Sequence, residues 1–427
     1  MKQKLIAFIE ACGLKQVFIL SSGVVIAQVI GILAQTVATR LYDPDQFGLL
    51  NLLVSLVSMF TPLVTMQYEY SIITEKTDKN ANSVTAVCFL FCSIGTFVFA
   101  VGVTIYNIIV PETFAELGGW LSVSVVMIFF SGIASIATSY NNRFGQYGII
   151  SKVSVYRAAV SGAVKLAYGA VKPSFVGLVL SNIISTAFGM RKQTKYMRQK
   201  ENMTQIARVS REDLKGAFLR NINQMLYSTP GLFIIGYSSS VIPFYIKSLY
   251  GLTENGFYAI TVSTISLPLT LISANVGKVF FKNAAQEYNT TGSFFKSVKS
   301  TVLMLSVISA AGFTLLYFIA VPLFSLVYGS EWARSGQFAV YIVPLYAIKF
   351  VSHAVNGGLI IRKKQKMLLV VRSLFLVASF ICYYAAKYLA LPIETFLIMI
   401  SLSYAALYLV LLIMVIINSR DTLAKAA

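Results

Sequence analysis

The chain has 427 residues, of which 57% are hydrophobic and 12% are charged, and its mean hydropathy is +0.73. Because about a quarter of the residues in soluble domains are charged, this composition excludes a soluble globule and indicates a polytopic membrane protein. The net charge of +19 could suggest a nucleic-acid partner. The positions of the basic residues, clustered in the polar connections between apolar runs, argue against one.

The apolar runs predict an all-α polytopic membrane protein with twelve transmembrane helices in two six-helix lobes related as parallel repeats. A helix needs about 20 residues to cross the hydrocarbon layer. Runs of that order lie near 17–39, 47–66, 84–110, 120–140, 153–171, 174–190, 217–237, 256–276, 298–320, 336–360, 367–388 and 392–417.

A basic stretch at 191–215 separates the two sets of six, with eight basic and three acidic residues. It is typical of a cytoplasmic loop. With the N-terminus placed inside, 26 Lys and Arg residues fall on the inner side and five on the outer side. We therefore expect both termini to be cytoplasmic, with lobes at 1–190 and 216–427 joined by the basic linker. Residues 1–16 lack a cleavage signal and are expected to remain on the protein.

The first two runs carry patterned small and polar residues. The first run repeats Gly and Ala at helical spacing, which predicts a face for close helix packing. The second run places polar residues from Asn51 to Glu69 within roughly 80° of one helix face, which favours a water-filled cavity. Glu69 is a candidate for ion coupling, because burial and hydration move a carboxyl pKa in opposite directions. The alternative is a structural Glu69 paired with Lys76 or Lys79.

The fifth run places Arg157, Lys165 and Tyr168 on one face of a helix. An ammonium at the bilayer centre costs roughly 2.5 to 3.5 kcal/mol on insertion scales. Lys165 should therefore face a partner, a cavity or a ligand, and the scarcity of acidic residues at that depth favours a cavity. A lysine that snorkels or pairs with a carboxylate is the alternative.

The second half carries similar side chains. Arg220 and Gln224 share a face of the seventh run, and Lys349 and His353 share a face of the tenth. His353 is the single histidine of the sequence, and it is a candidate for proton relay or for a hydrogen-bonded helix contact. Basic groups from both halves suit an anion that must cross lipid, such as a phosphate or pyrophosphate headgroup.

Prolines and a short internal repeat add to the pattern. Pro230 and Pro268 predict interruptions in the seventh and eighth runs. A Leu-Tyr pair precedes a glycine by the same number of residues at 41–48 and at 249–256. This repeat supports two parallel halves with substrate between them. Cys88 and Cys92 lie one helical turn apart and are expected to be packing residues, and no metal or cofactor is expected.

Several short stretches resemble the lipid-linked oligosaccharide (O-antigen) flippases, the polysaccharide transporter branch of the multidrug/oligosaccharidyl-lipid/polysaccharide exporter superfamily. They lie over most of the chain, at 38–48 running into Tyr68-Glu69, 140–143, 227–231, 256–259, Leu267-Pro268 and Tyr328-Gly329 followed by Trp332. The family commonly has Arg near the positions where this chain has Gln67 and Ser263. The cationic contacts of the family therefore cannot all be assigned to this chain.

The resemblance implies a bacterial inner-membrane protein that alternates between inward-open and outward-open forms. It implies undecaprenyl-pyrophosphate-linked glycan as substrate, membrane lipids and other polysaccharide-assembly proteins as partners, and coupling to an ion gradient, as in an antiporter serving lipopolysaccharide synthesis. A lipid II flippase and a multidrug antiporter of the same superfamily remain alternatives. A membrane glycan polymerase or acyltransferase is a further alternative, but the outer connections are short and His353 has no acid within one turn.

Overall fold

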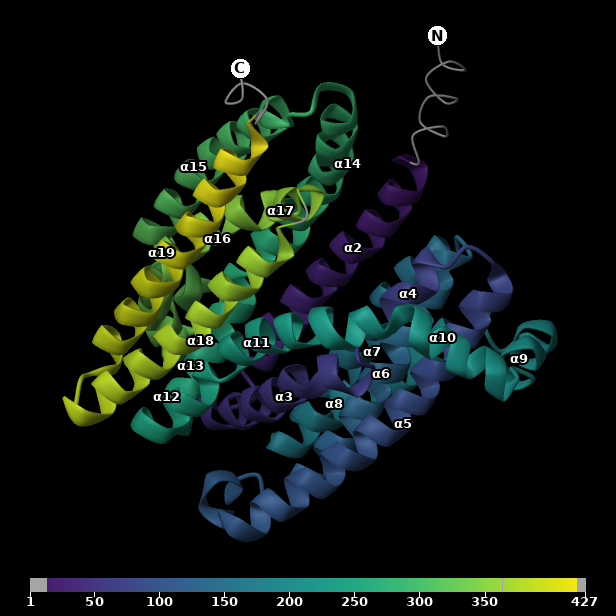
Figure 1. The fold of residues 1–427 in the computed structure, drawn as a ribbon. Coiled ribbons are helices and arrows are strands. Elements are labelled where there is room, and N and C mark those ends of the chain that lie inside the picture. The colour runs from purple at the N-terminus through teal and green to yellow at the C-terminus, as the bar shows by residue number, and fades with distance from the viewer. Residues whose placement is uncertain (1–13, 363, 421–427) are drawn as a thin grey trace. The chain divides into compact units, whose positions relative to one another are not determined.

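The computed structural model describes residues 14–362 and 364–420 (Figure 1). Within these ranges, the side chains of 14–21, Thr113, Phe114, Asn223, Gln224, Tyr227 and Gln365 are outside the description. The described residues are almost entirely helical and contain no β-strand. The expected all-α fold class is therefore confirmed. The expectations for residues 1–13 and for the tail beyond 420 lie outside the described residues.

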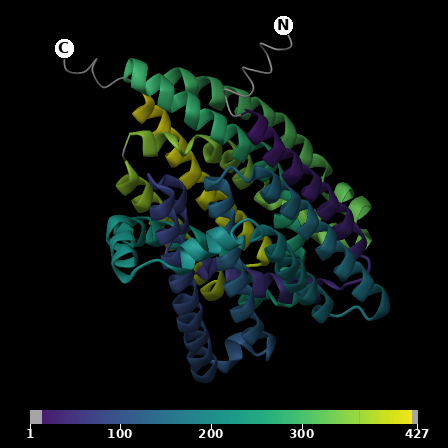
Figure 2. The same ribbon diagram turned by 90° about the vertical axis from the view of Figure 1, so that its right-hand side faces the viewer.

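The helices pack into two compact units, 1–241 and 242–427. In the first unit the elements are α2 (Leu14–Ala38), α3 (Pro44–Val64), α4 (Glu69–Thr74), α5 (Asp78–Ile109), η1 (Pro111–Phe114), α6 (Trp120–Arg143), α7 (Tyr147–Val171), α8 (Phe175–Gln193), α9 (Lys200–Ala207), α10 (Arg211–Asn223), η2 (Gln224–Ser228) and α11 (Thr229–Ser240). Its α7 packs against both α2 and α8, and α3 packs against α6 and α11. The antiparallel α5 and α6 lie side by side in both ribbon views (Figures 1 and 2).

The second unit contains longer helices. Its elements are α12 (Ile242–Tyr250), α13 (Leu252–Ile265), η3 (Leu269–Ser273), α14 (Ala274–Thr291), α15 (Phe295–Tyr328), η4 (Ser330–Trp332), α16 (Ala333–Val355), α17 (Gly358–Ile361), α18 (Gln365–Tyr388) and α19 (Ile393–Ser419). The central element is α16, which packs against α13, α14, α15 and α19. Consistent with that position, α16 is rich in fully buried side chains such as Phe338 and Phe350.

Every predicted apolar run coincides with helix in the described ranges. Nine described helices are long and apolar enough to cross a membrane. The helices α7 and α8 fall outside that set, because α7 carries basic residues within its length and α8 ends in Arg191 and Lys192. Large apolar side chains such as Phe318 (74% exposed) and Leu326 (78% exposed) cover the outer faces. Such surfaces are stable against lipid and would be a liability in water.

The small-residue face of α2 packs as the sequence predicts. A Cβ on Gly23 would overlap the Ser151 side chain of α7 and lie 2.8 Å from the Ser151 carbonyl oxygen. A Cβ on Gly162 of α7 would lie 3.0 Å from the Cβ of Ala34. Both glycines therefore allow α2 and α7 to approach closely, which fixes the position of the α7 face that carries the basic residues.

The predicted interruptions of the seventh and eighth runs are confirmed. The π-helical turn η2 precedes α11, whose first turn contains Pro230, and the π-helical turn η3 follows Pro268. Such turns are common at functional sites because they release backbone groups from the regular ladder.

The basic stretch at 191–215 is more ordered than the predicted loop. It contains α9 and the beginning of α10, which dock on the first unit through an ion pair between Lys79 Nζ and Asp213 (3.1 Å) and a hydrogen bond from Asn82 to Gln205 (2.8 Å). The hydrogen bonds from Lys79 and Ser210 lower the pKa of the Asp213 carboxyl. The linker therefore packs with the first unit, and the lobe boundaries drawn from the sequence remain a proposal.

Candidate functional site

The basic residues of α7 lie at the junction of α7 with α2 and α8. Lys165 donates a hydrogen bond from Nζ to Gln35 Oε1 of α2 (3.4 Å), and its carbonyl oxygen accepts one from the Tyr42 hydroxyl (2.7 Å). No described carboxylate contacts the Lys165 ammonium. The Tyr168 ring lies over Gly177 of α8, where a Cβ would overlap it. Lys165 is therefore a half-buried cation with a neutral partner.

Arg157 lies beside a polar recess of about 140 Å³ formed by α3, α6, α7 and α8. The polar residues that line this recess are Ser58, Ser131, Arg157, Asn182 and Thr186. The Arg157 guanidinium donates from Nη2 to the Thr186 hydroxyl (2.9 Å), and no described carboxylate contacts it. A recess of this volume holds several water molecules or one small anion. It offers a guanidinium, an amide and three hydroxyl groups, the set of donors that an oxyanion requires.

A glycine makes room for the Arg157 side chain. A Cβ on Gly189 of α8 would overlap the Cγ of Arg157 and lie 2.7 Å from its Cδ. Gly189 therefore holds the guanidinium at the recess by leaving space for its aliphatic stem.

The structure does not bring Arg220 to this recess. Its guanidinium pairs with Glu75 (3.7 Å), and the neighbouring Asn221 donates to the same carboxylate (2.9 Å). The side chain of Gln224 lies outside the described residues. Arg143, which the sequence analysis did not select, donates to the carbonyl oxygens of Ile73 and Glu75 and pairs with Asp78 (3.0 Å). These two arginines secure the connection between α4 and α5.

Glu69 lies in an interruption that the sequence did not reveal. The polar stripe of the second run stops when α3 ends at Val64, because Met66 (φ 50°) and Gln67 (φ 59°) adopt left-handed backbone conformations before α4 begins at Glu69. Such values are rare for residues other than glycine. The prediction of one continuous polar helix face through Glu69 is therefore wrong.

Glu69 is buried, with 4% of the residue exposed. Its Oε1 accepts a hydrogen bond from Ser135 of α6 (3.0 Å). Within the described part of the chain, its Oε2, the Gln67 Oε1 and the Ser71 hydroxyl are buried without a hydrogen-bond partner. Since Lys79 pairs with Asp213, the structural alternative of a Glu69–Lys79 pair is not present.

In the second unit, Lys349 lies in an aromatic environment. Its Nζ lies 5.1 Å from the centroid of the Tyr346 ring and 5.7 Å from that of Tyr408, within the range of cation–π attraction. His353 lies one turn further along α16, where its Nδ1 is 3.5 Å from the Ser273 hydroxyl. No described carboxylate contacts either residue, so a carboxylate–histidine relay is not formed at His353.

A different arginine of α16 is fully compensated. Arg334 Nη2 lies 2.8 Å from Glu394 of α19 and 3.3 Å from Glu254 of α13. This triad ties three helices of the second unit together. By contrast, Arg157 and Lys165 have no carboxylate partner among the described residues.

The residues that complete these environments could not be selected from the sequence. Ser135 and Thr186 are ordinary helical residues that lie more than 25 positions from Glu69 and Arg157, and only the packing of α6 and α8 brings them close. The described residues contain no group of three His, Cys, Asp or Glu side chains that could hold a metal ion. Cys88, Cys92 and Cys382 are buried free thiols.

The fold is that of a known class of membrane transporters. An inward-facing multidrug resistance transporter of the MATE family, in the MOP superfamily, aligns with a TM-score of 0.71 and 12% identity over 92% of this chain and 94% of its own. Lipid II flippase MurJ, in an inward closed conformation, aligns with a TM-score of 0.63 and 11% identity over 93% and 87%. A eukaryotic MATE transporter aligns at 0.56 and 13% identity over 95% and 94%.

Nine described helices could cross a membrane, and the chain has the fold of the MATE and MurJ structures, so it is a multi-pass membrane protein with that fold. The sequence profile described as polysaccharide biosynthesis protein matches residues 20–337, and the chain belongs to that family. The curated proteins include no match to this sequence. The protein is therefore a multi-pass membrane protein of the polysaccharide biosynthesis family.

Proposed function

We propose that the protein is a flippase that moves undecaprenyl-pyrophosphate-linked oligosaccharide units from the cytoplasmic to the outer leaflet of the bacterial inner membrane. Transport would proceed by alternating access and be coupled to an ion gradient. Family membership supports a polysaccharide intermediate as cargo. The observation that carries the proposal is the pair of uncompensated cations on α7, Arg157 and Lys165.

The chemistry of these cations favours an anionic lipid over a cationic drug. A charge held at membrane depth without an opposite charge is costly unless a ligand or water compensates it. A pyrophosphate supplies the missing negative charge and accepts hydrogen bonds from a guanidinium in two directions. A cationic drug would be repelled by the same groups. Lys349 of the second unit, near Tyr346 and Tyr408, extends the proposed set of cations.

A lipid II flippase is the second candidate, because MurJ shares the fold and its substrate also carries a pyrophosphate. The cations do not separate the two substrates. Direct competition between lipid II and a lipid-linked oligosaccharide in a transport assay would do so.

Glu69 is the proposed coupling group. A buried carboxylate with one unpartnered oxygen can take up a proton when the unit opens to one side and release it to the other. The left-handed residues Met66 and Gln67 store strain directly beside it. Binding of an ion at Glu69 would therefore act directly beside this strained stretch of backbone.

Replacement of Lys165 tests the substrate site. We expect Lys165→Ala to abolish glycan export and Lys165→Arg to retain more activity than Lys165→Gln, because Arg keeps the charge. Export is measured in a host strain that lacks its own oligosaccharide flippase, with the amount of protein in the membrane determined in parallel.

Lys152→Ala is the matched control, since Lys152 is an exposed basic residue of the same helix. Full export by Lys165→Ala, or an equal loss in Lys152→Ala, would show that Lys165 is not a substrate contact.

A further inference from the structure

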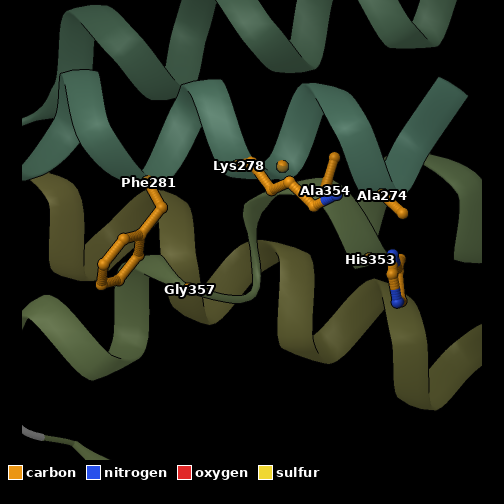
Figure 3. Close-up of a pocket in the computed structure, with 7 residues that line it drawn as sticks. Ala274, Lys278, Phe281, His353, Ala354 and Gly357 are labelled. Carbon is orange, nitrogen blue, oxygen red and sulfur yellow. The ribbon is translucent and has the colours of Figure 1, made fainter. Parts of the chain in front are cut away.

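A second basic site lies in the second unit, in a groove of about 390 Å³ between α14 and α16. Figure 3 shows Lys278 and Phe281 extending from α14, with His353 on the facing helix. The volume falls within the usual range for small-ligand sites, about 300 to 1,000 Å³. The α7 cations do not line this groove, and neither the family match nor the fold assigns it a role.

Small residues shape the groove. A Cβ on Gly277 would lie 3.1 Å from the carbonyl oxygen of Ala354, so this glycine permits close approach of the two helices. A Cβ on Gly357 would lie 2.7 Å from the Phe281 ring, so Gly357 provides the space that the ring occupies. The result is a floor of backbone and small side chains with one aromatic wall.

Both ionisable residues that line the groove are bases. Lys278 donates to the Asn275 side chain (3.2 Å), and His353 lies 3.5 Å from the Ser273 hydroxyl. The charged group near His353 on its own helix is Lys349, and the one from α14 is Lys278. No described carboxylate contacts Lys278 or His353, so the groove has positive potential without an internal counter-ion.

We propose that this groove binds the phosphate or pyrophosphate group of a lipid. The predicted orientation places Lys278 at the cytoplasmic boundary of the membrane, at the depth of lipid headgroups. Basic pockets between helices at that depth are suited to anionic headgroups. The aromatic wall at Phe281 would contact the first apolar carbons of the lipid chain. This inference rests on the proposed function, because it supplies an entry site for the substrate lipid on the second unit.

Binding to the purified full-length protein in detergent tests the groove without requiring transport. The probes are a short isoprenyl pyrophosphate and inorganic pyrophosphate, measured by calorimetry at pH 5.5 and pH 8. The phosphate groups of the probes also gain protons over this range, so the parent is compared with His353→Gln at each pH. The parent should bind more tightly than this variant at pH 5.5, where protonation of an imidazole adds a positive charge. Lys278→Gln should weaken binding about tenfold at both pH values, as expected for loss of one charge-assisted hydrogen bond.

The difference in affinity between the parent and His353→Gln should be smaller at pH 8, where an imidazole is neutral. Lys278→Arg should retain binding, and Lys299→Gln is the control, because Lys299 is an exposed base of α15 outside the groove. Tighter binding of the isoprenyl probe than of inorganic pyrophosphate would identify a lipid as the source of the phosphate. Equal binding of the two probes would show a site for free phosphate and would overturn the assignment to a lipid.

Unchanged affinity in both Lys278→Gln and His353→Gln, or an equal loss in Lys299→Gln, would overturn the assignment. A failure of the proposed transport function would appear differently. Membrane vesicles that contain the purified protein would then show no translocation of glycan, whereas the probes would still bind to the groove.

Discussion

Replacing Arg157 by Gln should abolish transport and leave the folded protein about as stable as the parent. Arg157 has the Thr186 hydroxyl as its hydrogen-bond partner and no described carboxylate. Loss of one hydrogen bond to a charged group costs about 1.5 to 3 kcal/mol. Removing a guanidinium from the membrane returns at most about 2.5 to 3.5 kcal/mol, the insertion-scale value for the helix centre. The two effects nearly cancel, so the net change in stability should stay within about 2 kcal/mol.

For ligand binding, no second effect offsets the loss of the Arg157 guanidinium. If the guanidinium donates to a phosphate, loss of that contact should weaken binding by about 1.5 to 3 kcal/mol, which is roughly a 10- to 150-fold change in affinity. Thermal unfolding in detergent measures stability, and glycan export in the flippase-deficient host measures function. Arg157→Gln should show a normal unfolding temperature together with lost export.

Arg334→Gln is the matched control, because the same substitution there leaves Glu254 and Glu394 without their cation. Breaking a fully buried pair costs about 3 to 5 kcal/mol, and we expect roughly 1 to 3 here because Arg334 is 30% exposed. Export per folded molecule should be retained. If Arg157→Gln lost more than about 3 kcal/mol of stability, or exported glycan at the parental level, the assignment of Arg157 to the substrate site would be wrong.

Three further predictions follow from the fold and the site. Gly189→Ala should reduce export with little change in protein level, because a Cβ there displaces the stem of Arg157, and an unaffected export rate would show that the position of the guanidinium is unimportant. Glu69→Gln, compared with Glu69→Ala in vesicles with an imposed pH gradient, should lose the gradient-dependent part of transport because Gln cannot titrate; parental activity of the Gln variant would make Glu69 structural. Reporter fusions at Ser330 and Lys200 should report opposite sides of the membrane, as the distribution of basic residues predicts, and signals from one side would refute the proposed orientation.

The helices and several site residues could be predicted because their signals are local. Apolar length locates the membrane helices, and proline marks the turns η2 and η3 before any packing is known. The scarcity of acidic residues at membrane depth similarly argued against a carboxylate partner for Lys165, and the ammonium contacts Gln35. The cavity expected at Lys165 stays a prediction.

The interruption before Glu69 could not be predicted, because Met66 and Gln67 are neither glycine nor proline. Residues of α5 and α6 pack against the end of α3 at this interruption. A Cβ on Gly95 of α5 would lie 2.8 Å from the Val64 carbonyl oxygen, and a Cβ on Gly132 of α6 would lie 3.3 Å from the Val64 side chain. These glycines let α5 and α6 close around the end of α3. Burial of Glu69 and its contact with Ser135 therefore depend on tertiary structure.

Translocation by the purified protein tests the central claim most directly. Vesicles containing the protein and an isoprenyl-pyrophosphate-linked oligosaccharide are treated with a membrane-impermeant glycosidase, which trims the glycans that reach the outer surface. Vesicles with the parent protein should expose nearly all of the glycan over time, whereas those with Arg157→Gln and Lys165→Gln combined should match protein-free vesicles. Equal exposure in the parent and the protein-free vesicles, or full activity of the double variant, would contradict a flippase that holds its lipid pyrophosphate through the cations of α7.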